Sequence, residues 1–362
     1  MMKRSNWKHG HFTMPSRLVL PLAIVMALVL GGVFLACSGY SPIAAYGALL
    51  RGSFGNINAL AEVLVKTTPL LLASLGLIIS SRAQFISIGS EGQIYLGAMG
   101  AAAVGLFDGE LPPVIAIPTC MIAAVAISAL WGGLAGWLKV RLNANEVIVT
   151  LMMNYVAIEL VRYFVNGPWR DPNSVEPFTA QIMASAWLPK LIPRTRLHIG
   201  ILIALAMTIL FWWLIHHTTF GYRLTVCGAS PEAAIANGIN SRRMIILSML
   251  ISGGMSGLAG SIELMGIHHR LIEDISPSYG FTAIIIAILG RGEPIRVLFA
   301  AFFFAVLTVG ADGMRMELGI PTAVGSILQA LVLMFALGSE IYERRLQKQE
   351  QIRFRAAEEE GA

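Results

Sequence analysis

The polar residues that could do chemistry in this chain lie within otherwise apolar stretches. Glu91, Gln93, Asn154, Glu159 and Glu263 each interrupt a run of hydrophobic residues. A carboxylate or an amide at membrane depth costs free energy unless it finds a partner, and such groups commonly mark transport pathways. We therefore take Glu91, Gln93 and Asn154 as candidates to line a pathway through the membrane.

Each of these groups also has a structural explanation. Glu91 and Gln93 lie where a helix is expected to begin, so the Glu91 carboxylate could instead cap that helix by accepting hydrogen bonds from its first free N–H groups. Asn154 lies in the middle of a span, where an interhelical hydrogen bond explains it as well as contact with a ligand does. Glu159 can pair with Arg162 on one helix face, which favours a structural role.

A polar interruption at residues 220–243 carries a different pattern. Ser230 is a good helix N-cap, Pro231 suits the first helical position, and Glu232 complements the positive start of the helix. Gly238 suits the left-handed position that ends a helix. We expect a helix of about seven residues, roughly 10 Å long. A partner protein would recognise such a helix by its shape, because it carries no chemically reactive side chains. Its surface would carry three alanines: Ala233, Ala234 and Ala236. Alone, the segment could equally be an ordinary loop with one helical turn.

The composition places the whole chain in a membrane. The sequence is 56% hydrophobic and 13% charged, which leaves too little polar surface for a soluble protein. Apolar stretches close to the roughly 20 residues that a helix needs to cross a bilayer follow one another almost end to end. We therefore predict an all-α integral membrane protein of about ten transmembrane helices. The net charge of +5 comes from basic residues in short loops, and nucleic-acid binding is excluded.

The predicted organisation is one transmembrane domain over residues 18–340. Residues 1–17 form a cytoplasmic N-terminal segment and residues 341–362 a cytoplasmic tail. In this topology seventeen of the 26 Lys and Arg residues lie inside and seven outside, as expected when basic residues favour the cytoplasm. The interruption at 220–243 is then cytoplasmic, and the proline-rich loop at 166–197 is an external, interfacial or lightly folded patch.

Two short stretches indicate an internal repeat. Ile86-Ser-Ile-Gly-Ser-Glu-Gly92 and Ile275-Ser-Pro-Ser-Tyr-Gly280 each open the next helix, although they match one residue out of register. In the predicted topology their two units run in opposite directions. That is the arrangement of inverted repeats.

No set of residues is typical of a catalytic or metal centre. The sequence has neither a Gly-x4-Gly-Lys-Ser/Thr phosphate loop nor a Gly-x-Ser-x-Gly elbow. The three cysteines, Cys37, Cys120 and Cys227, have no metal-ligand spacing, and no pair suits an extracellular disulfide. We expect no catalytic residue, metal or cofactor, so the energy for transport must come from elsewhere.

Several motifs resemble one family of transport proteins. Glu232-Ala233-Ala234 followed by Gly238 resembles the EAA-x3-G loop by which permeases of ABC importers dock onto their ATPase. Three longer stretches are similar to ribose- and nucleoside-type permeases: Phe85-Ile-Ser-Ile-Gly-Ser-Glu-Gly-Gln93, Asn145-Glu-Val-Ile-Val-Thr-Leu-Met-Met-Asn-Tyr155 and Tyr279-Gly-Phe-Thr-Ala-Ile-Ile-Ile-Ala-Ile-Leu-Gly-Arg291. The resemblance covers most of the chain and is strongest to permeases that work with a basic-membrane-protein-type nucleoside receptor.

The resemblance implies a permease subunit of an ATP-driven importer that moves nucleosides across the inner (plasma) membrane. Its partners would be a cytoplasmic ATPase, a second and non-identical permease subunit, and an extracytoplasmic substrate-binding protein. The residues implied to couple the ATPase to transport are Ser230, Pro231, Glu232, Ala233, Ala234 and Gly238. A simple-sugar permease is the close alternative, since sugar and nucleoside share the ribose. An ion-coupled secondary transporter would explain the buried carboxylates but not the docking helix.

Overall fold

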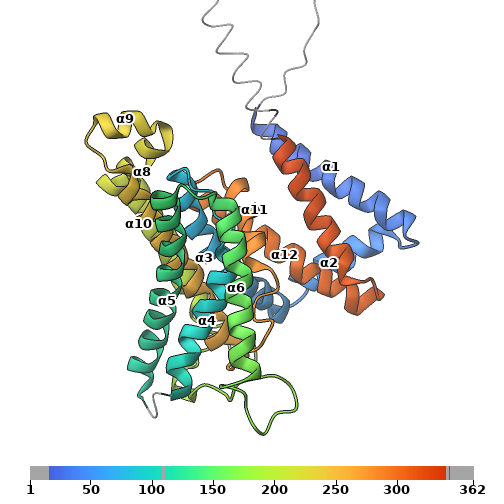
Figure 1. Ribbon diagram of the computed structural model, residues 1–362. Coiled ribbons are helices and arrows are strands. Elements are labelled where there is room, and N and C mark those ends of the chain that lie inside the picture. Colours follow the sequence, from blue (N-terminus) through green and yellow to red (C-terminus); the bar gives the residue numbers. More distant parts are fainter. Residues whose placement is uncertain (1–15, 108–110, 340–341, 343–362) are drawn as a thin grey trace, which may run out of the picture. The chain divides into compact units, whose positions relative to one another are not determined.

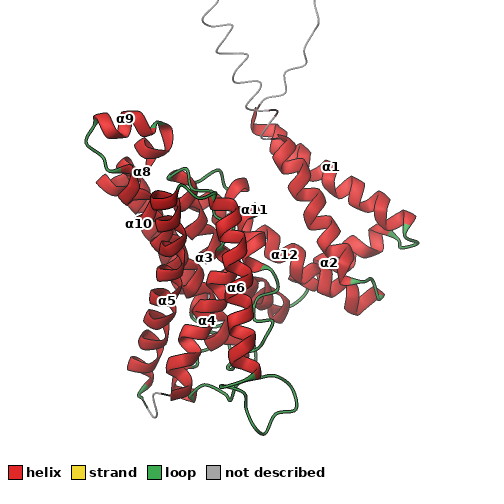
Figure 2. Cartoon of the chain, viewed as in Figure 1, coloured by secondary structure: helices red, strands yellow, loops and turns green. Residues whose placement is uncertain are grey.

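The computed structural model describes residues 16–107, 111–339 and 342. In these parts of the chain all regular elements are helices, joined by loops with three isolated β-bridges (Figure 2). The predicted all-α class is confirmed. The predicted cytoplasmic segments at the two ends, 1–17 and 341–362, lie almost wholly outside the described residues.

Seven of the described helices are long and apolar enough to cross a membrane. They are α3 (Ile57–Arg82), α5 (Pro113–Leu142), α6 (Glu146–Asn166), α7 (Gly200–His217), α10 with η2 (Ser241–His268), α12 (Pro294–Leu318) and the helix Thr322–Ser339. An eighth span results if α1 (Ser16–Cys37) and α2 (Pro42–Phe54), which meet at a bend of 118°, are counted together. The shorter helices α4 (Ser90–Phe107) and α11 (Tyr279–Leu289) are additional. The described residues thus contain seven or eight candidate spans and two shorter helices, so the predicted number of about ten spans is only approximate.

The chain divides into two compact units. The larger unit comprises residues 49–313, and the smaller unit joins residues 1–48 to residues 314–362. Within the smaller unit, α1 lies directly against the helix Thr322–Ser339, since a Cβ on Gly31 would come within 2.2 Å of Leu328 Cδ2. The candidate functional residues all belong to the larger unit.

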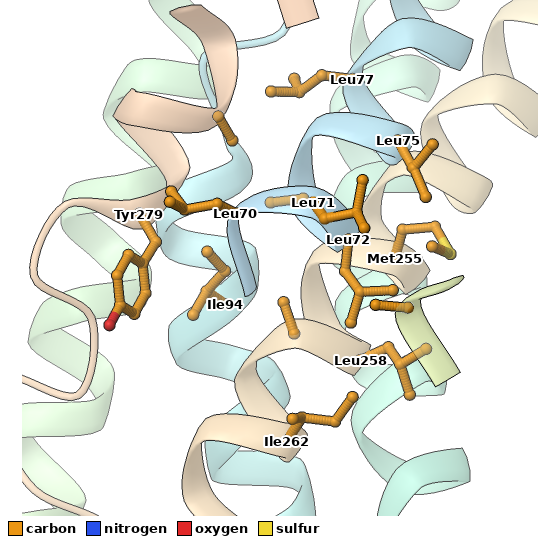
Figure 3. Close-up of a cluster of buried hydrophobic side chains, with 14 of the residues drawn as sticks. Leu70, Leu71, Leu72, Leu75, Leu77, Ile94, Met255, Leu258, Ile262 and Tyr279 are labelled. Carbon is orange, nitrogen blue, oxygen red and sulfur yellow. The ribbon is translucent and has the colours of Figure 1, made fainter. Parts of the chain in front are cut away.

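The core of the larger unit forms around α3 and α10. The middle of α3 is buried, and α10 packs against α3, α4 and α5. Figure 3 shows leucines of α3 beside Ile94 of α4 and Met255, Leu258 and Ile262 of α10. Glycines let these helix backbones approach closely: a Cβ on Gly260 would lie 2.0 Å from the Ile94 carbonyl oxygen. This packing fixes the positions of the polar residues described next.

Candidate functional site

The first turns of α4 and α11 meet inside the larger unit. The Glu91 carboxylate, on α4, accepts a hydrogen bond of 2.7 Å from the Gly280 N–H, on α11. The two backbones are so close that a Cβ on Gly280 would lie 2.3 Å from the Glu91 nitrogen. A carboxylate at a helix start stabilises the unpaired N–H groups there. Glu91 thus serves a helix start, but the helix is α11 rather than its own.

Asn154, on α6, holds the loop that leads into α4. Its Oδ1 accepts a hydrogen bond from the Gly92 N–H at 2.9 Å, and its Nδ2 donates to the Ile88 carbonyl at 2.7 Å. One turn earlier, the Thr150 hydroxyl accepts a hydrogen bond of 3.1 Å from the Ile88 N–H. Asn154 is 1% exposed, and both polar atoms of its amide have partners. The interhelical hydrogen bond considered from sequence is therefore present, while contact with cargo stays a prediction.

Gln93 lies on the same helical turn as Glu91, and its side chain reaches α5 at Gly132. Its side chain is buried. Its Nε2 lies close to Gly132, since a Cβ added to Gly132 would lie 3.1 Å from that nitrogen. Its backbone carbonyl accepts a hydrogen bond of 2.8 Å from the Ser128 hydroxyl. The Gln93 Oε1 has no hydrogen-bond partner among the residues that the structure describes. The structure thus gathers Glu91, Gln93 and Asn154 around the first turn of α4, and their place on a pathway stays a prediction.

Replacing Asn154 with leucine should lower the stability of the protein. We expect Asn154→Leu to cost about 1–3 kcal/mol, because the buried Gly92 N–H and Ile88 carbonyl lose their partner. Thermal unfolding of the purified protein measures this change. Asn166→Leu, at an exposed position of the same helix, is the matched control and should change little, because its hydrogen bonds to the Arg162 carbonyl and to Glu273 lie at the surface, where water can replace them. Equal unfolding temperatures for both variants and the wild type would contradict the role of Asn154 in holding the loop before α4.

The interruption predicted from sequence forms two short helices, α8 (Thr219–Ala229) and α9 (Pro231–Ala236). The Ser230 Oγ accepts a hydrogen bond of 3.2 Å from the Ala233 N–H and donates one of 3.0 Å to the Glu232 carboxylate. The predicted N-cap and first turn are confirmed, in a helix of six residues rather than seven. Figure 1 shows α9 at one end of the larger unit, beyond the end of α10.

The end of α9 is also as predicted. Gly238 has a φ of +71°, and the Ile239 N–H donates to the Ala234 carbonyl at 2.9 Å, the pattern of a Schellman end. The expected surface of three alanines is wrong in one respect. Ala234 is buried against α8 and α10, and Ile235 is 69% exposed instead. A helix of six residues is too short for the sequence pattern to fix which face turns inward.

Arg82, at the end of α3, joins three elements near α8 and α9, which we call the docking segment after the role predicted for it from sequence. Its Nη2 donates to the Glu293 carboxylate and to the Gly292 carbonyl, both at 3.0 Å, in the turn before α12. Its Nη1 lies 3.4 Å from the Thr225 hydroxyl of α8. No sequence pattern singled out Arg82, because its partners are far away in the chain.

The backbone of α8 also touches the end of α3. The Gln84 side-chain amide donates a hydrogen bond of 2.7 Å to the Gly228 carbonyl. A Cβ on Gly228 would lie 2.0 Å from the Arg82 carbonyl oxygen, so only glycine fits there without movement. The docking segment is therefore in direct contact with a helix that runs through the core.

The loop at residues 166–197 is held more firmly than a lightly folded patch. The Ile182 N–H donates to the His269 carbonyl at 2.9 Å, and the Trp187 ring stacks on the His269 ring with centroids 4.2 Å apart. Burial lowers the pKa of His269, which favours the neutral form of its ring. In Figure 1 this loop follows α6 at the end of the larger unit opposite to α9.

Comparison with known proteins identifies the family. The family described as branched-chain amino acid transport system, permease component, matches residues 59–337. The chain belongs to this family of permeases, and the resemblance to ABC importer permeases is confirmed. The guanosine ABC transporter permease protein NupP of Bacillus subtilis is 35% identical over 329 residues, which cover 90% of this chain and 94% of NupP.

Two other relatives match over similar lengths. The glucose ABC transporter permease protein TsgB13 of Haloferax volcanii is 34% identical over 333 residues, 89% of this chain and 87% of that protein. The nucleoside ABC transporter permease protein NupB of Lactococcus lactis is 29% identical over 347 residues, 93% of this chain and 95% of NupB. The family and the apolar helices together define a multi-pass membrane protein.

Proposed function

We propose that this chain is the permease subunit of an ATP-driven importer that carries nucleosides across the inner (plasma) membrane. The observation that carries the proposal is the nearly full-length similarity to permeases named for guanosine and for nucleosides. The helix α9, which is exposed and capped at both ends, supports the proposal. The sequence has no phosphate loop of its own, so such an importer needs a surface on which a separate ATPase subunit can bind and transmit its conformational change.

In this proposal ATP is hydrolysed on a separate cytoplasmic subunit that binds α9. The ATPase contacts the exposed side of the helix, formed by Glu232, Ala233 and Ile235. Movement of α9 passes through α8 to α3 at Gly228, and through Arg82 to the start of α12. A second, non-identical permease subunit completes the pore, and a substrate-binding protein delivers cargo on the external side.

The proposed orientation places both termini and α9 in the cytoplasm and the 166–197 loop outside. Its support is the excess of Lys and Arg in the segments assigned inside, together with the positions of α9 and the loop at opposite ends of the larger unit.

Cysteine labelling tests this orientation in a variant that lacks Cys37, Cys120 and Cys227. We expect a cysteine at Asn173, in the loop, to react with a membrane-impermeant reagent in intact cells. One at Gln347, in the C-terminal segment, should react only after the cells are permeabilised. The reverse pattern would overturn the orientation.

Uptake of radiolabelled substrates tests the proposed function. Cells that lack other nucleoside carriers should accumulate a nucleoside only when the permeases, the ATPase and the receptor are all present, and only while ATP is available. Accumulation of ribose without any nucleoside would favour a sugar permease, the second candidate, which the similarity to the glucose permease supports. Uptake that follows an ion gradient and ignores ATP would contradict both.

A further inference from the structure

A second group of polar side chains surrounds the first residue of α11. We call Lys66, Glu263, His268 and Tyr279 the Tyr279 cluster; they belong to α3, α10, η2 and α11. The Lys66 ammonium donates to the Tyr279 hydroxyl oxygen at 2.6 Å. The Glu263 Oε1 lies 3.5 Å from that hydroxyl and 3.7 Å from the His268 Nε2. Figure 3 shows the Tyr279 hydroxyl directed away from the neighbouring leucines.

The Glu263 carboxylate has hydrogen-bonding capacity that the described residues leave unused. The residue is 1% exposed, and its Oε2 has no hydrogen-bond partner in the part of the chain that the structure describes. The contacts of Oε1 are long. Burying a carboxylate costs free energy unless hydrogen bonds or an ion pair compensate. Glu263 is therefore ready to accept hydrogen bonds from a molecule that enters the cluster.

The other members of the cluster define which groups it can receive. An ammonium has only hydrogen-bond donors, so Lys66 occupies the oxygen of Tyr279 and leaves the phenolic hydrogen free to point at Glu263 or at a ligand. Lys66 would repel a metal cation, and Glu263 would repel an anion. Neutral hydroxyl groups, which both donate and accept, suit this mixture of groups.

The backbone at the cluster is unusual as well. Directly after Glu263, α10 passes into the π-helical turn η2 (Leu264–His268), a conformation that is rare and often found at functional sites. The His268 side chain, at the end of this turn, is 30% exposed. The His268 side of the cluster is thus partly exposed, while the Glu263 carboxylate is buried.

We propose that Glu263, with Tyr279 and His268, forms a subsite for two adjacent hydroxyl groups of the cargo. One hydroxyl donates to each oxygen of the carboxylate, and the Tyr279 hydroxyl and the His268 imidazole pair with the same hydroxyls. The ribosyl ring of a nucleoside carries such a diol. The assignment rests on the proposed function, since it concerns how this permease would hold the cargo that the receptor delivers.

Uptake of a ribonucleoside and of its 2′-deoxy form tests the subsite. We expect Tyr279→Phe and Glu263→Gln to slow uptake of the ribonucleoside about tenfold, and that of the deoxynucleoside by less than about twofold. The receptor is the same in every assay, so its own preference cancels when each variant is compared with the wild type for each substrate. Glu146→Gln is the matched control. Glu146 lies at the start of α6 and pairs with Lys139 at 2.6 Å, so this variant should affect both substrates alike.

The outcomes separate the two proposals. Equal slowing of both substrates by the cluster variants, or no slowing, overturns the subsite. If the wild-type complex transports neither nucleoside, the proposed function fails instead. Tyr279→Phe removes a single oxygen atom, so it decides the question should Glu263→Gln fail to reach the membrane.

Discussion

Gly280→Val should prevent the larger unit from reaching its native packing. A Cβ at this position would lie 2.3 Å from the Glu91 backbone nitrogen, so the starts of α4 and α11 would have to separate. Overpacking alone typically costs about 1–3 kcal/mol, and separation would also break the hydrogen bond from Gly280 to the Glu91 carboxylate. We expect a loss of stability above about 3 kcal/mol, measured as folded yield and unfolding temperature.

Gly338→Val is the control for this prediction. It makes the same replacement within a helix, but nothing lies within 4 Å of the added Cβ. The control should unfold close to the wild-type temperature. If Gly280→Val does so too, the close approach of the two helix starts is not needed for folding.

Combining Glu232→Ala with Gly238→Val should abolish uptake while the permease still reaches the membrane. The first change removes the carboxylate at the start of α9, and the second places a β-branched residue at a φ of +71°, a conformation that is strained for β-branched side chains. The helix would lose the shape that we propose the ATPase recognises. Uptake and the amount of co-purified ATPase should therefore fall together.

Gly319→Val provides a matched comparison for the docking variant. Gly319 has a similar φ of +67° with no atom near its Cβ position, but it follows α12 rather than α9. The backbone strain introduced by valine is similar at the two positions. If α9 has a specific docking role, Gly319→Val should therefore keep most of the uptake. Wild-type transport by the double variant would refute the coupling role of α9.

The features that could be predicted from the sequence depend on neighbours in the chain. The cap at Ser230 and the stop at Gly238 involve hydrogen bonds within a few residues, and the pair of Glu159 and Arg162, at 2.7 Å, spans one helical turn. Such contacts follow from helix geometry alone. Local signals therefore located the docking segment and most of the helices.

The remaining features depend on contacts between distant parts of the chain. Glu91 was a candidate to cap its own helix, but the N–H group that it accepts from is 189 residues away. The same holds for the partners of Arg82 and for the members of the Tyr279 cluster. They come from different helices, and the spacing of residues in the sequence does not determine how those helices pack. Glu263 was noted in the sequence as a polar residue within an apolar stretch. Lys66 was not, because a single lysine near the start of a helix usually extends its ammonium group into water.

The structure of α9 has a consequence for the kinetics of assembly. The helix is capped at both ends and anchored by the buried Ala234, so its shape exists before any partner arrives. A surface that is already ordered avoids the entropy loss of ordering at association, about 0.5–1.5 kcal/mol for each immobilised flexible side chain. An ATPase could then leave and return without a folding step, and variants that loosen α9 should change the rate of dissociation more than the rate of encounter.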